Sequence, residues 1–142
     1  TGDSPTFDAS TLDGPLSFTL ALRVTDTPGD AHIATTTLDV NNVAPTADAG
    51  GPYTVPEGGS VPMDATGSTD PGNDIATYEW DFDYDGLTFT EDATGATPIH
   101  TYTATGTFTI ALIVNDGTVD SAIATRVSDD IFAVCQLGHN AW

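Results

Sequence analysis

The sequence contains no lysine and only two arginines, Arg23 and Arg126, against 21 acidic residues, so its formal net charge is −19. A surface this acidic repels phosphate groups and anionic lipid headgroups, which argues against nucleic acids as partners and against membrane binding. The same surface attracts cations. Acidity alone also keeps a secreted or salt-exposed protein soluble, and this interpretation needs no bound ligand.

Paired cysteines and long apolar runs are also missing. The single cysteine, Cys135, excludes an intrachain disulfide, and no histidine stands beside it in a motif typical of a nucleophile. No apolar run approaches the roughly 20 residues that a membrane-spanning helix needs. Neither a secretory leader nor an Asn-x-Ser/Thr sequon is visible, so we expect a mature protein or a fragment, with glycans restricted to threonine oxygens.

Threonine, glycine, alanine and aspartate are abundant, and together they are typical of strands separated by turns. Threonine favours strands, whereas glycine, proline and aspartate interrupt them. No amphipathic helical pattern continues for more than two turns. Because 39% of the residues are hydrophobic, the chain has enough apolar side chains for a core. The composition therefore predicts an all-β protein.

An internal repeat organises the chain. The segment FTLALRVTD (18–26) matches FTIALIVND (108–116), and TGDSP (1–5) matches TGATP (94–98) with the offset shifted by three residues. In both long copies apolar residues alternate with polar ones, which is the period of a half-buried strand. We therefore predict the back half of one repeat unit in residues 1–43, a complete unit in 44–128 and a divergent tail in 129–142.

The motifs of this repeat resemble those of the PKD domain, the immunoglobulin-like module named after the polycystic kidney disease protein. The carrying segments are NVAPTADAGGPYTVPEGGSV, DATGSTDPGNDIATYEWDFDYDG, PIHTYTATGTFTIALIVNDG and, in the partial unit, LALRVTDTPGDAHIATTTLDV. The resemblance implies an all-β immunoglobulin-like sandwich, with Trp80 in its core. It also implies a non-catalytic spacer, adhesion or accessory role in tandem arrays of bacterial secreted or cell-surface proteins.

The stretch DFDYDGLTFTED places acids at the spacing of a twelve-residue calcium loop, but its context predicts a strand instead of flanking helices. In a strand, Asp81, Asp83 and Asp85 project from one face and the intervening aromatic residues from the other. We therefore expect the aromatic rings to pack and the carboxylates to face outward. Solvated, turn-forming aspartates are the simpler interpretation of this row.

The resemblance also implies a calcium site, because some PKD domains bind calcium near the interdomain linker. The matching positions are Asn42, Asp70 and Asp81, with Asp83 and Asp85 as additional candidate ligands. Calcium bound there would stiffen the joint between the units. Oxygen ligands suit calcium, and the lack of Cys/His clusters argues against zinc.

Three functions are compatible with these features. The first is a non-catalytic extracellular structural or adhesion module whose partners are neighbouring repeats. No Ser-His-Asp arrangement is visible, and we expect His100 in its HTY motif to be a packed or turn-capping histidine and not a catalytic base. Residues 1–43 alone would expose half a sandwich with open strand edges, so something must complete them.

The second function is a filament subunit, in which identical subunits associate head to tail and exchange strands. The donor would be the apolar tail residues Ile131, Phe132, Val134 and Leu137. The third is a carbohydrate-binding accessory domain of a secreted hydrolase, with polysaccharide as partner. Its sugar-stacking platforms would be Tyr53, Tyr78 and Tyr102, each of which fits a strand position equally well.

Overall fold

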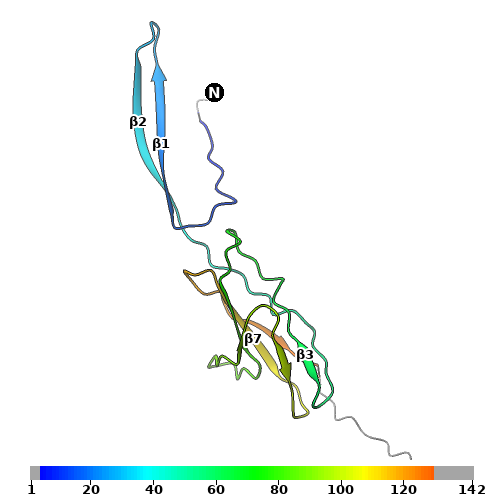
Figure 1. Cartoon of the computed structure of the whole chain (residues 1–142). Helices are drawn as coiled ribbons and strands as arrows, with labels where there is room; N and C mark the ends of the chain where they lie inside the picture. Colours follow the sequence, from blue (N-terminus) through cyan, green and yellow to red (C-terminus); the bar gives the residue numbers. More distant parts are fainter. Residues whose placement is uncertain (1–3, 130–142) are drawn as a thin grey trace, which may run out of the picture. The chain divides into compact units, whose positions relative to one another are not determined.

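The computed structural model describes residues 4–129, and their regular secondary structure consists entirely of β-strands (Figure 1). The described residues divide into two compact units: residues 4–43 with 71–73, and residues 44–70 with 74–129. The all-β, immunoglobulin-like prediction is confirmed. A helix long and apolar enough to cross a membrane is not found within residues 4–129. The predicted tail lies almost wholly outside the described residues.

The first unit is built on a long antiparallel hairpin of β1 (Leu16–Thr25) and β2 (Ala31–Val40) (Figure 1). The connecting turn follows from its sequence, TDTPGD. Asp26 Oδ1 accepts the backbone N–H groups of Gly29 and Asp30 at 3.3 and 2.9 Å. Gly29 has φ = +123°, a conformation that glycine adopts without steric strain. An aspartate and a glycine at these positions therefore close the hairpin locally.

The alternating pattern gives this hairpin one apolar face. Leu20 and Leu22 of β1 lie opposite Thr36 and Ala34 of β2, on the same side of the two strands. The segment before β1 runs beside this face, where the Phe7 ring lies 5.8 Å from the ring of Phe18. It is fixed at its end by Asp13, whose Oδ1 accepts the N–H groups of Gly14 and Val43 at 2.9 and 2.8 Å.

The second unit is the sandwich. One sheet pairs β3 (Ser60–Pro62) with β6 (Ile99–Thr101). The other has four antiparallel strands in the order β5-β4-β7-β8. Their bounds are β5 Ala93–Thr94, β4 Thr77–Asp81, β7 Thr109–Asn115 and β8 Ala124–Val127.

Trp80 lies at the centre of the core, as predicted, with none of its surface exposed. Its Nε1–H donates to the carbonyl oxygen of Gly95 at 2.8 Å, so the polar atom of the indole is satisfied. The apolar face of β7 is completely buried. The other buried apolar residues of this core are Ala49, Tyr53, Val55, Val61, Met63, Ala65, Phe82, Tyr102, Ile110, Leu112 and Val114.

Candidate functional site

The acidic stretch after Trp80 forms a loop that is held by its own carboxylates. Strand β4 ends at Asp81, which is 1% exposed. Its Oδ1 accepts the N–H of Asp83 at 3.1 Å, and its Oδ2 accepts the N–H of Thr90 at 2.8 Å. The prediction that this carboxylate faces outward was wrong. Because the strand ends here, the alternation stops, and the buried carboxylate pairs with backbone donors across the loop.

The other acids of the stretch also have structural partners. Asp92 Oδ2 accepts the N–H of Phe82 at 2.8 Å, which ties the far end of the loop back to β4. Asp85 Oδ1 accepts the N–H groups of Thr88 and Leu87, both at 2.8 Å. These two donors hold the pKa of the Asp85 carboxyl below its ordinary value. Turn formation therefore accounts for Asp85 without a bound ion.

The structure gathers carboxylates at two places in the second unit. Oxygens of Asp81, Asp83 and Asp92 lie within 4.8 Å of one another, and so do oxygens of Asp70 and Asp116. Asp85 belongs to neither group. Carboxylate oxygens fit calcium by their chemistry. In the first group, however, both oxygens of Asp81 already accept backbone N–H groups.

Asp70 and Asp116 differ in being buried, with 7% and 8% of their surfaces exposed. Two carboxylates this close and this dehydrated repel each other, so a cation between them would be favourable. Asn42, the remaining predicted ligand, is half-buried and belongs to the first unit. The calcium set inferred from the sequence thus stays a prediction.

Sequence reasoning missed Asp116 and considered Asp92 only as the twelfth position of the calcium-loop spacing. The internal repeat offered a signal for Asp116, because it aligns with Asp26. Like Asp26, it closes a hairpin turn, since its Oδ1 accepts the N–H groups of Thr118 and Val119 at 2.7 and 2.8 Å. The signal for Asp92 was its place at the end of the DFDYDGLTFTED spacing, but its hydrogen bond to the N–H of Phe82 depends on the folded loop.

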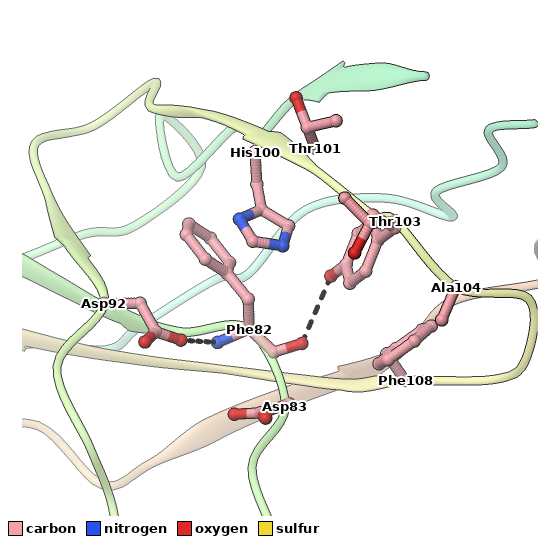
Figure 2. Close-up of a pocket in the computed structure, with 9 residues that line it drawn as sticks. Phe82, Asp83, Asp92, His100, Thr101, Thr103, Ala104 and Phe108 are labelled. Atoms are coloured by element: carbon pink, nitrogen blue, oxygen red, sulfur yellow. Dashed lines mark hydrogen bonds between the residues drawn. The ribbon is translucent and has the colours of Figure 1, made fainter. Parts of the chain in front are cut away.

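A cavity of about 240 Å³ opens beside the acidic loop (Figure 2). A row of aromatic rings forms one wall, in which His100 stands 4.2 Å from Phe82 and 4.4 Å from Tyr102, measured between centroids. The Tyr102 hydroxyl donates to the Phe82 carbonyl oxygen at 3.2 Å. The complete lining is Phe82, Asp83, Asp92, His100, Thr101, Tyr102, Thr103, Ala104 and Phe108.

The electrostatics of this cavity favour neutral rings. Burial lowers the pKa of His100, against a smaller opposing effect of Asp92 and Asp83. Burial also raises the pKa of the Tyr102 hydroxyl, and the same two carboxylates add to that increase. Within residues 4–129 the structure records no hydrogen bond from His100 to a hydroxyl or a carboxylate. His100 is therefore a packed side chain, as predicted, and the cavity wall contains no activated nucleophile.

Two of the three tyrosines proposed as sugar platforms are buried. Tyr53 is 6% exposed and Tyr102 is 3% exposed, so the prediction that they offer open ring faces was wrong. The Tyr53 hydroxyl donates to the Ala49 carbonyl at 2.7 Å and accepts the Asp64 N–H at 2.9 Å. Both rings fill the core because each hydroxyl finds a backbone partner there.

The most distinctive surface lies on the first unit. Hairpin β1–β2 has the same register as β7–β8, since Leu22 lies opposite Ala34 just as Leu112 lies opposite Ala124. The equivalent leucines differ sharply in burial, however: Leu22 is 63% exposed and Leu112 is not exposed at all. A cavity of about 750 Å³ adjoins this apolar face. We call the apolar side of β1 and β2 the open face; its exposed members on β1 are Leu16, Leu20, Leu22 and Val24.

Comparison with known proteins agrees with this architecture. The family model for the PKD domain matches residues 42–128. The chain belongs to the PKD family. It is also similar to collagenase ColQ1 of Bacillus cereus (strain Q1), with 41% identity over 80 residues. That match covers 55% of this chain but only 8% of the collagenase. A PKD domain is a non-catalytic accessory module, even where the relative as a whole is an enzyme.

Proposed function

We propose that this chain is a non-catalytic structural module from a bacterial secreted or cell-surface protein in which PKD repeats follow one another. Residues 44–128 would be one complete repeat, and residues 4–43 would be the back half of its neighbour. The observation that carries this proposal is the shared register of β1–β2 and β7–β8, combined with the exposure of Leu22. The acidic surface without lysine suits a protein in contact with the external medium.

The same observation favours a spacer over a ligand-binding role. In the second unit Leu112 is covered by a core that includes Trp80 and Met63, which belong to the front half of the repeat. The first unit has the back-half hairpin without that cover. A repeat divided in this way gains stability only when its two halves meet, so the function we assign is to link and space neighbouring repeats.

Sedimentation velocity over a wide concentration range tests this proposal against filament formation. We expect a monomer at every concentration, because the matching strand of a second copy, β4, is already paired with both β5 and β7 and is not free to complete the first unit. Concentration-dependent polymers would contradict the array and favour strand exchange between subunits. A pull-down on insoluble polysaccharides should recover none of the chain, whereas retention would support the carbohydrate-binding alternative.

We also propose that calcium binds at Asp70, with Asp116 as the second carboxylate. The support is the burial of both side chains and the distance of less than 4.8 Å between their oxygens. Bound calcium would neutralise charges that burial otherwise makes unfavourable, and it would stiffen this end of the sandwich.

A further inference from the structure

The open face has an open edge beside it. Strand β1, which is ten residues long, pairs with β2 alone in the described structure, so every second residue of β1 directs its N–H and C=O groups to an edge without a neighbouring strand. The equivalent edge of β7 is paired with β4. A long edge without proline that adjoins exposed leucine and valine side chains is a template for another strand.

The register of the second unit predicts what such a strand would meet. On β7, Trp80 of β4 lies opposite Leu112, and Glu79 lies opposite Ile113. Shifted by the repeat offset, these two positions on β1 are Leu22 and Arg23. A strand that docked on β1 as β4 docks on β7 would therefore place its aromatic residue beside Leu22 and its next outward residue beside Arg23.

We propose that the open edge of β1 receives the β4-equivalent strand of a PKD front half, antiparallel to β1, with an acidic residue opposite Arg23. This inference rests on the proposed function, because the partner is the missing half of a repeat. The chain's own β4 has the required pattern, Tyr-Glu-Trp. An aromatic residue would pack beside Leu22, and a carboxylate would pair with the guanidinium across the strands.

Arg23 is suited to select such a partner. It is one of two cationic side chains in residues 4–129, and the other, Arg126, donates to the Gly50 carbonyl at 2.6 Å. On the paired side of β1, Arg23 lies opposite the uncharged Ile33. The described residues contain no ion pair to Arg23. A strand that pairs with the open edge of β1 could therefore place an acidic residue directly opposite Arg23.

A second copy of this chain is a poor source of that strand. Its β4 is already paired on both edges, with β5 and with β7, and Trp80 is completely buried. Releasing it would dismantle the core of the second unit. The occupant we infer is therefore a separate front half with the sequence character of residues 44–93.

An extended chain tests this inference directly. A copy of residues 44–93 is placed ahead of Thr1, where the sequence continues naturally, because residues 1–5 repeat residues 94–98. Hydrogen exchange of the β1 amides is then compared between the original and extended chains, with β7 as internal reference. We expect exchange in β1 to slow roughly tenfold or more while β7 is unchanged. Trp80→Ala in the copied segment should abolish this protection.

Charge exchange tests the role of Arg23. In the extended chain, Arg23→Glu alone or Glu79→Lys in the copied segment alone should accelerate β1 exchange about two- to fivefold, the size expected for cross-strand charge pairs. Both changes together should restore the slow rate. The matched control combines Arg23→Glu with Glu79→Lys in the original second unit, where Ile113 lies opposite, and this combination should restore nothing.

Each outcome bears on a different statement. If hydrogen exchange of β1 is the same in the extended chain as in the original chain, the proposal that the β1 edge binds a front-half strand is wrong. A monomer in sedimentation would still support the spacer function in that case. Protection without rescue by the double exchange would overturn the acidic partner of Arg23. Protection that rises with concentration in the original chain would assign the edge to a second copy and overturn the inferred occupant.

Discussion

Leu22→Ala and Leu112→Ala remove the same atoms from equivalent positions of two hairpins with the same register. We predict that their effects on stability differ severalfold. The pair is informative because each leucine lies within a strand and opposite an alanine, Ala34 for Leu22 and Ala124 for Leu112. What differs is the cover on the side chain, so the difference in unfolding free energy measures that cover.

The magnitude follows from burial. Leu112 is fully buried and lies beside Trp80 of the neighbouring strand, so its truncation combines lost transfer free energy with a cavity and costs about 2–5 kcal/mol. Leu22 is 63% exposed, so only about a third of its surface is withheld from water. Scaling a full burial of about 1.5–3 kcal/mol by that share gives roughly 0.5–1 kcal/mol, with no cavity to add.

Urea denaturation of the two variants and the wild type provides the measurement. Near-UV circular dichroism follows the packing of Trp80 in the second unit, and hydrogen exchange of β1 and β2 follows the first unit. The reasoning is refuted if Leu22→Ala costs as much as Leu112→Ala in the original chain. In the extended chain the two costs should converge, because both leucines are then buried in the core of a complete sandwich.

Tyr53→Phe should cost about 1–3 kcal/mol in thermal denaturation because it leaves two backbone groups unpaired, whereas Tyr102→Phe loses one hydrogen bond and should cost about 1 kcal/mol; equal costs would contradict this assignment. NMR titration should give His100 a pKa below its ordinary 6.5, since burial disfavours its charged form. As the pH falls, the unfolded chain binds a proton at this histidine before the folded chain does. The contribution of neutral His100 to the free energy of unfolding is therefore complete above pH 6.5 and is lost as the pH falls below it; a native pKa at or above 6.5 would contradict burial as the dominant effect. Calcium at 100 times its dissociation constant should stabilise the wild type by about 2.7 kcal/mol. Asp70→Asn should lose that response and Asp85→Asn should keep it, and the reverse pattern would move the site to the acidic loop.

Much of the fold could be predicted because its signals are local. The alternation in residues 18–26 and 108–116 identified two strands and the apolar face of each, which is exposed on β1 and buried on β7. Trp80 was placed correctly for the same reason, since it lies within a regular alternating strand. Predictions failed where the strand ends. Asp81 follows the alternation in sequence, but the chain turns there and the carboxylate is drawn inside by the N–H of Thr90.

The candidate site could be predicted only in part because it depends on pairings across the fold. Asp70 and Asp116 are 46 residues apart in sequence, and only the folded sandwich brings their oxygens together. The cavity beside His100 likewise needs the acidic loop to fold against β6. The spacing of residues along the sequence does not indicate that the acidic loop packs against β6, because the loop between β4 and β5 has no regular period.

The two hairpins separate what a strand sequence determines from what it leaves to a partner. Their pairing and register are the same whether the apolar face is covered, as at Leu112, or exposed, as at Leu22, so the turn and the alternation suffice for the hairpin itself. The identity of the partner that covers this face must then be inferred from the positions at which the two hairpin sequences differ. Arg23 occupies the position equivalent to Ile113, on the side of the strand that faces away from the core, where packing does not require an arginine. A charge at that point on an open edge therefore carries information about the incoming strand, and reversing it should change which strand is accepted.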